Sequence, residues 1–178
     1  MCNRRGANTA KRSHFVFRKN KNINTKKIGV IGLSAGGLVS ACAVGIVKGI
    51  KSLVLLSAVA RYKKLWDKKL ITGGRKGFPK AGVDVGGLLV GRDFYEALER
   101  LDDFNLKSIR NFKNPLLIIH GENDKVVLSF DAKLYYNTSG SLKKKLIIVK
   151  NADHTFANVK SEKRVIGIIC KWFKRTLK

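Results

Sequence analysis

Four short runs of consecutive apolar residues constrain this sequence most strongly. They lie within residues 26–31, 52–56, 115–119 and 145–149. Continuous apolar runs of this length are typical of strands that are buried on both faces, which occur mainly in parallel sheets. The sequence therefore predicts an α/β fold with a parallel sheet of about four strands.

Helices are predicted between and after these strands. One continues the first strand over residues 38–47, another covers 128–136, and apolar residues recur at helical spacing near the C-terminus (Val165, Ile166, Ile169, Trp172 and Phe173). Alternation of strands and helices indicates right-handed crossovers, with helices flanking the sheet. The interval 60–114 interrupts this alternation of strands and helices. It contains glycine pairs and a predicted helix at 93–101, and we interpret it as a cap-like insertion.

Residues 28–47 form a stretch of 20 residues without a charged side chain, which is long enough to span a bilayer. Its glycines and serines lower its hydrophobicity and interrupt it in the middle. We therefore favour a strand, a tight turn and a helix over a membrane span.

The chain is strongly basic, with 37 Lys and Arg against 12 Asp and Glu and a formal net charge of +25. No acidic residue precedes Asp67, so residues 1–25 read as a basic N-terminal tail. Such a charge predicts non-specific binding to polyanions. Specific nucleic-acid recognition is not predicted, because no RNP, zinc-finger or helix-turn-helix pattern is present.

The three cysteines, Cys2, Cys42 and Cys170, are far apart and odd in number, which indicates neither a disulfide framework nor a metal-binding pair. The basic start lacks the long apolar core of a secretory signal. These features favour a cytoplasmic location. An Arg-rich, acid-free start is also found in organelle transit peptides, which stays an alternative.

The chemistry-bearing motif is Gly32-Leu33-Ser34-Ala35-Gly36, which fits G-x-S-x-G between a predicted strand and a predicted helix. This context is that of a nucleophile elbow, in which the residues two positions before and after the serine must be small for the turn to close and leave the serine hydroxyl exposed. The backbone N–H of Ala35 could then stabilise an oxyanion at the helix N-terminus. Glycine-rich turns of this kind also bind phosphates or merely pack tightly.

An acid and a histidine follow at the ends of the third and fourth predicted strands. Asp124 comes just after 115–119, with Glu122 as a nearby competitor, and His154 follows 145–149. The carboxyl ends of parallel strands meet at one edge of a sheet, so these side chains are expected near Ser34. We interpret His154 as the base, Asp124 as the group that orients it, and His120 as a structural histidine.

The segments GLSAGG, LLIIHGENDKVV and NADHTF together resemble the α/β-hydrolase superfamily, particularly acyl-ester hydrolases of the serine-aminopeptidase and dienelactone-hydrolase-like branch. The resemblance covers residues 26–178. It implies strands five to eight of the usual eight-stranded sheet, a cap inserted after strand six, and the catalytic set Ser34, Asp124 and His154. It implies no cofactor and no metal.

Members of this superfamily carry four further strands and a loop, often containing His-Gly, that donates a second oxyanion N–H. Only 33 residues precede Ser34 here. The sequence therefore predicts a truncated α/β-hydrolase domain at 26–178, weak or inactive without an N-terminal half, with an exposed edge strand through which the chain could form a homodimer.

The expected function is that of a serine hydrolase acting on a small-molecule carboxylic ester or thioester through an acyl-enzyme on Ser34. The alternative is a catalytically impaired hydrolase remnant that acts, if at all, as a basic interaction protein.

Overall fold

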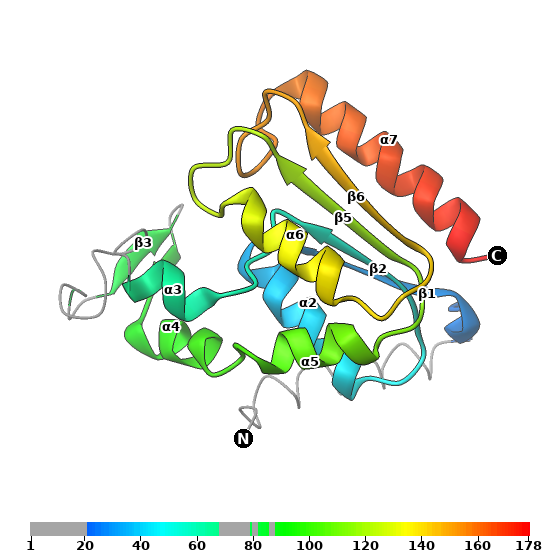
Figure 1. Cartoon of the computed structure of the whole chain (residues 1–178), viewed down its shortest axis with the longest axis horizontal. Coiled ribbons are helices and arrows are strands. Elements are labelled where there is room, and N and C mark those ends of the chain that lie inside the picture. Colours follow the sequence, from blue (N-terminus) through cyan, green and yellow to red (C-terminus); the bar gives the residue numbers. More distant parts are fainter. Residues whose placement is uncertain (1–20, 68–78, 80–81, 86–87) are drawn as a thin grey trace.

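The computed structural model describes residues 21–67, 79, 82–85 and 88–178 (Figure 1). In chain order, the elements are the 3-10 helix η1 (Thr25–Lys27), β1 (Ile28–Leu33), α2 (Ala35–Ile46), β2 (Ile50–Leu56), α3 (Tyr62–Asp67), β3 (Val83–Val85), β4 (Leu88–Val90), α4 (Arg92–Glu99), α5 (Phe104–Asn111), β5 (Leu116–Gly121), α6 (Ser129–Thr138), β6 (Lys144–Val149) and α7 (Val159–Thr176). All four predicted strands of the main sheet are present.

The first strand begins later than the sequence predicts. Lys26 and Lys27 belong to the single turn η1 instead of β1. The side chain of Asn24 accepts a hydrogen bond from Lys26 N, and the carbonyl of Asn24 accepts one from Lys27 N. These local bonds hold the backbone in a turn, because an Asn side chain can satisfy N–H groups that a strand would otherwise pair.

The main sheet is parallel throughout, with the strand order β1-β2-β5-β6. The two central strands are covered on both faces, and Leu53, Val54, Leu117 and Ile118 have no exposed surface. This arrangement confirms the predicted α/β fold with a parallel four-stranded sheet. Burial of each such aliphatic side chain stabilises the fold by roughly 1.5–3 kcal/mol.

Helices cover the sheet on both faces (Figure 1). On one face, α2, α5 and α6 pack over alternate strand residues such as Leu55 and Ile118. Ile109 of α5 belongs to the same apolar cluster as these two residues. On the other face, within the described residues, α7 and the loop before it supply the cover, and Val165 of α7 packs with Val54 in the same cluster as Trp172 and Phe173. The odd and even residues of each central strand thus enter two separate cores.

The interval 60–114 contains two kinds of structure. Helices α3 and α4 belong to a third apolar cluster, which joins Tyr62 and Leu98 to Leu38 of α2 and Val127. By contrast, α5 packs directly against α2 and contributes to the main core. The glycine pairs predicted for the insertion, at 73–74 and 86–87, lie outside the described residues. The division into a tail, a hydrolase domain and a cap stays a prediction.

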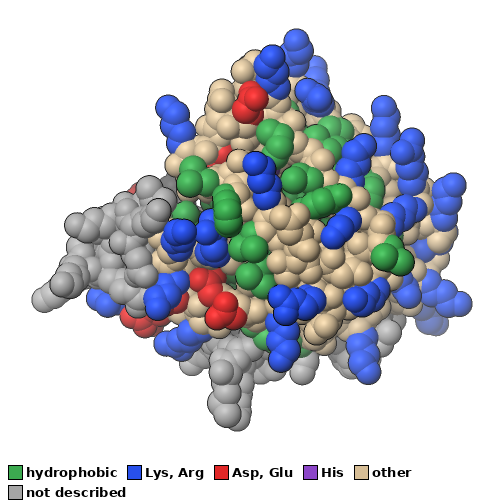
Figure 2. Space-filling view, viewed as in Figure 1, with side chains coloured by type: hydrophobic (Ala, Val, Ile, Leu, Met, Phe, Trp, Pro, Cys, Tyr) green, Lys and Arg blue, Asp and Glu red, His purple; other side chains and the backbone are tan. Residues whose placement is uncertain are grey.

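The stretch 28–47 folds as β1 and α2, as predicted for a strand, a turn and a helix. Among the described helices, none combines the length and apolar character needed to cross a bilayer. The predicted basic tail falls largely on residues 1–20, which are outside the described part of the chain. Within the described part, Lys and Arg side chains are spread over the visible face and form no single cluster (Figure 2).

Candidate active site

Ser34 lies at the junction of β1 and α2, in a strained backbone conformation. Its φ of 54° and ψ of −121° fall in a region that non-glycine residues rarely adopt. The end of β2 and the loop after it hold this turn in place, since Ser34 N donates to Leu56 O over 2.9 Å and Val59 N donates to Ser34 O over 3.3 Å. Strain of this kind costs about 1–3 kcal/mol and is common at functional sites.

The glycines around Ser34 have different roles. A Cβ on Gly32 would lie 2.4 Å from the carbonyl oxygen of Gly36, and one on Gly37 would lie 2.4 Å from the Cβ of Ala58. A Cβ on Gly36 would meet no described atom within 4 Å. The expectation that both glycines two positions from the serine must be small is therefore right for Gly32 and wrong for Gly36. The other tight position is the adjacent Gly37, because α2 packs there against Ala58 in the loop that follows β2.

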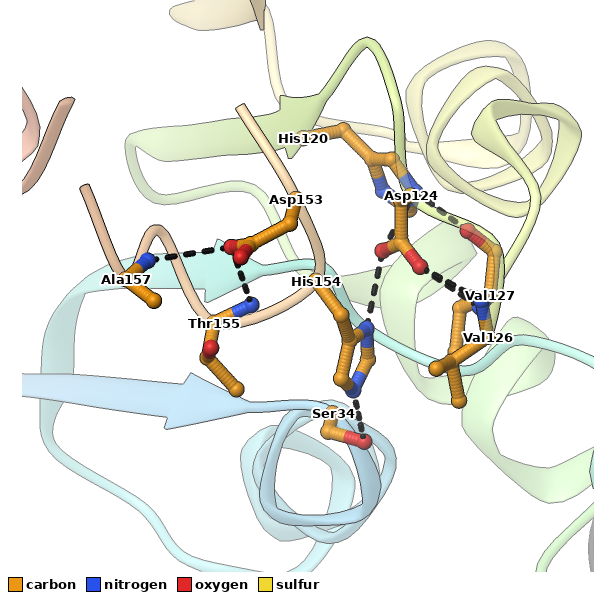
Figure 3. A network of polar contacts seen from close by, with 9 residues as sticks. All are labelled: Ser34, His120, Asp124, Val126, Val127, Asp153, His154, Thr155 and Ala157. Atoms are coloured by element: carbon orange, nitrogen blue, oxygen red, sulfur yellow. Dashed lines mark hydrogen bonds and ion pairs between the residues drawn. The ribbon is translucent and has the colours of Figure 1, made fainter. Parts of the chain in front are cut away.

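The structure brings the three predicted site residues together (Figure 3). His154 Nε2 lies 2.9 Å from Ser34 Oγ, and His154 Nδ1 lies 2.8 Å from Asp124 Oδ2. Asp124 follows β5 and His154 follows β6, so both loops leave the sheet at the edge where β1 turns into α2. Parallel strands that end together produce this meeting of residues separated by up to 120 positions.

The Asp124 carboxylate is buried and has donors on both oxygens. Its Oδ1 accepts hydrogen bonds from Val126 N (2.9 Å) and Val127 N (2.8 Å). Burial alone would raise the pKa of Asp124, but hydrogen bonds from His120, His154 and Val127 N outweigh it and hold the pKa well below its usual range. The carboxylate is therefore ionised at neutral pH and able to orient a histidine.

The two other candidates from the sequence take different positions. Glu122 Oε2 accepts a hydrogen bond from Asn151 N, so this carboxylate ties two loops together. His120 lies inside β5 with Nε2 2.7 Å from Val127 O and 3.2 Å from Asp124 Oδ2. Sequence reasoning treated His120 as structural and did not find its contact with Asp124. Its position four residues before Asp124, at a strand end, was the available signal.

Two further residues shape the histidine loop. Asp153 Oδ1 accepts hydrogen bonds from Thr155 N (3.2 Å) and Ala157 N (3.0 Å), which closes the loop behind His154 (Figure 3). A Cβ on Gly121 would lie 2.3 Å from Asp153 O, so only glycine lets the end of β5 approach this loop. Sequence reasoning gave neither residue a role, although Gly121 stands next to His120.

Ala35 is the first residue of α2, half-buried beside Ser34. Its N–H has no carbonyl four residues earlier within the helix, so it is available to a ligand at the helix N-terminus. The role of this N–H as an oxyanion donor stays a prediction. In the part of the chain that the structure describes, no group of three or more His, Cys, Asp or Glu side chains could hold a metal ion.

The overall structure is similar to those of several hydrolases. The esterase domain of a Rhodothermus marinus protein matches with a TM-score of 0.66 and 22% identity, over 84% of this chain and 62% of that domain. Lipolytic enzymes of metagenomic origin, LipS and LipT, match with a TM-score of 0.73 and 19% identity, over 96% of this chain and 74% of theirs.

A third similar structure is a puromycin-hydrolysing peptidase of Mycobacterium tuberculosis, with a TM-score of 0.70 and 15% identity, over 97% of this chain. This chain spans only 25% of that peptidase and 62% of the Rhodothermus domain. These likenesses show the α/β-hydrolase fold.

No individual curated protein matches the sequence significantly. The family model of the prolyl oligopeptidase family matches residues 13–178. Since that match covers most of the sequence and agrees with the fold, the chain belongs to the prolyl oligopeptidase family, within the α/β-hydrolase superfamily that its motifs resemble.

Proposed function

We propose that this chain is a serine hydrolase that cleaves carboxylic esters or thioesters through an acyl-enzyme on Ser34. The observation that supports it most directly is the hydrogen-bonded series from Ser34 Oγ through His154 to Asp124, with distances of 2.9 Å and 2.8 Å. A serine held this way has a base within reach of its proton and a carboxylate that orients the base.

In the proposed reaction, Ser34 Oγ attacks the substrate carbonyl carbon while His154 Nε2 takes the hydroxyl proton. The Ala35 N–H stabilises the oxyanion of the resulting tetrahedral intermediate. The intermediate collapses, the bond to the leaving alcohol or thiol breaks, and His154 gives it the proton. Water then attacks the acyl-enzyme with His154 again as the base, which releases the acid and returns the proton to Ser34.

Ester chemistry is favoured over other reactions by the kinds of protein that share the fold, which include esterases and lipolytic enzymes. The family name and the Mycobacterium tuberculosis neighbour point to peptide bonds as well. The same Ser, His and Asp groups act on both bonds, and an ester has the better leaving group. Esters and thioesters are therefore the substrates that this site would cleave first.

The test is labelling with a fluorophosphonate, combined with hydrolysis of p-nitrophenyl acetate. We expect Ser34 to carry the label, and both Ser34→Ala and His154→Ala to abolish labelling and turnover. Ser161→Ala, which changes a half-buried serine in α7, is the matched control and should behave as the unchanged protein. Absence of labelling in a folded protein would instead favour the remnant that acts as a basic interaction protein.

A further inference from the structure

Asp124 is in contact with a second histidine that the proposed reaction does not use. His120 has no exposed surface and lies in β5, one residue before the strand ends. Its Nε2 is 3.2 Å from Asp124 Oδ2, the same oxygen that lies 2.8 Å from His154 Nδ1. A single carboxylate oxygen thus faces two imidazole rings, one on each side (Figure 3).

The neighbours of His120 determine where its proton lies. Nε2 faces two acceptors, Val127 O at 2.7 Å and Asp124 Oδ2, so Nε2 must carry hydrogen. Nδ1 is buried without a hydrogen-bond partner among the described residues. A second proton there would be a buried donor without an acceptor, which costs more than a bare lone pair. The contacts therefore fit an imidazole with its hydrogen on Nε2.

The other charged groups of this region are engaged elsewhere or belong to the same network. Glu122, from the loop that follows β5, bonds to Asn151 N, and Asp153 bonds to the backbone of its own loop. Among the described side chains, the charged group that contacts His120 is therefore Asp124.

The contact with His120 completes the set of donors around the carboxylate. Val126 N and Val127 N donate to Oδ1, and His154 Nδ1 lies 2.8 Å from Oδ2. His120 Nε2, whose shorter hydrogen bond is to Val127 O, lies 3.2 Å from the same Oδ2. The backbone donors fix one oxygen, and the two rings fix the other. Removing His120 would leave Oδ2 with His154 as its one described donor, would remove one of the contacts that set the tilt of the carboxylate, and would concentrate its negative charge toward His154.

We propose that His120 is a positioning residue for the proposed reaction: its Nε2–H, shared between Val127 O and Asp124 Oδ2, helps to hold the carboxylate in the orientation that accepts the His154 Nδ1–H and withdraws part of its charge. His120 does not touch Ser34 or the substrate and acts through Asp124 alone. The effect on turnover rests on the proposed function, but the contact between His120 Nε2 and Asp124 Oδ2 does not.

Two substitutions separate this role from simple packing. In His120→Gln, an amide N–H can reach nearly the position of Nε2, whereas in His120→Asn the amide reaches only the region of Nδ1, where there is no partner. We expect His120→Asn to lower kcat about 10- to 100-fold with KM within about twofold, because a small misplacement of catalytic groups is costly. His120→Gln should recover most of this loss.

The pH profile gives a readout that packing would not change. Without the His120 donor, Asp124 attracts a protonated His154 more strongly. The acid limb of kcat/KM should therefore move to higher pH in His120→Asn and return toward the original profile in His120→Gln. The proposal would be overturned if both variants lost kcat equally, in proportion to a lower melting temperature, and kept the original pH profile. His120 would then be a core residue only.

Nuclear magnetic resonance tests the contact without turnover. The chain has three histidines, so ¹⁵N-labelled imidazoles can be assigned from single substitutions of His14, His120 and His154. We expect the His120 ring to show hydrogen on Nε2 at neutral pH and the His154 titration to move upward in His120→Asn. Hydrogen on Nδ1 of His120 would overturn the proposal even if the enzyme is active. If the spectrum is as expected but the protein does not hydrolyse esters, the proposed function is refuted and the contact between His120 and Asp124 stands.

Discussion

Oδ2 of Asp124 lies 2.8 Å from Nδ1 of His154, although the two residues are 30 positions apart in the sequence. This contact sets which nitrogen of His154 carries hydrogen, and so leaves Nε2 free to accept the proton of Ser34. In Asp124→Asn, the amide favours the opposite tautomer. We expect ester turnover to fall about 10³- to 10⁴-fold with the fold retained.

The control for this prediction is Glu122→Gln, which changes the other carboxylate of the same loop. Glu122 Oε2 accepts a hydrogen bond from Asn151 N, and among the described contacts it has none with His154, so turnover should change little. If Glu122→Gln lowered turnover as much as Asp124→Asn, the assignment of the orienting carboxylate to Asp124 would be wrong.

The acid dependence of stability should depend on Asp124. Its pKa in the folded protein is held below the ordinary value of 3.8 by the hydrogen bonds that it accepts, which outweigh burial. Its contribution to the free energy of unfolding is therefore fully present above about pH 4–5 and lost as pH falls toward the folded-state pKa. Urea unfolding at pH 7 and at several values between pH 5 and 2 should show a steeper loss in the unchanged protein than in Asp124→Asn.

The glycines of the elbow should differ in their tolerance of a methyl group. Gly37→Ala would place a Cβ 2.4 Å from that of Ala58, and we expect it to destabilise the fold by about 1–3 kcal/mol. In Gly36→Ala, the added Cβ meets no described atom within 4 Å, and alanine has the higher helix propensity. The free energy of unfolding of this variant should therefore be unchanged or higher by up to about 1 kcal/mol. Thermal melts of the two variants check this, and an equal loss in both would contradict the packing described for α2.

The edge position of β1 should promote self-association. In the described sheet, β1 pairs only with β2, and Ile31 is 48% exposed. Unpaired strand edges favour pairing with another chain, and charged residues prevent it. We expect concentration-dependent dimers by sedimentation, which Ile31→Lys weakens. Leu142→Lys changes an exposed apolar residue away from this edge and serves as the control. A monomer at high concentration would exclude this interface.

Polyanion binding should follow charge and not sequence. Residues 1–24 hold seven of the 37 basic side chains (Arg4, Arg5, Lys11, Arg12, Arg18, Lys19 and Lys21) and no acidic one. We expect heparin retention to fall steeply with salt, because counterion release drives it, and deletion of 1–24 to lower the eluting salt concentration. Unchanged elution after the deletion would place the binding on the folded surface.

The sequence by itself determined the four strands of the main sheet, the helices α2, α4, α6 and α7, and the chain positions of Ser34, Asp124 and His154. It did not predict α3, α5 or the β3–β4 pair. The features that it determined are local. Apolar runs mark the buried strands, and the glycines beside Ser34 mark a tight turn between a strand and a helix. Because parallel strands end at one edge, the order of the three residues along the chain was enough to predict that they meet.

Only the tertiary structure decided how similar residues divide their roles. Glu122 and Asp124 are two positions apart, yet one binds the backbone of Asn151 and the other binds His154. Likewise, α5 lies in the interval expected to be a cap but packs against α2, and His120 contacts Asp124 instead of serving the core alone. These contacts depend on which loops and side chains lie close together at the edge of the sheet. Their positions are set by packing between segments that are far apart in the sequence.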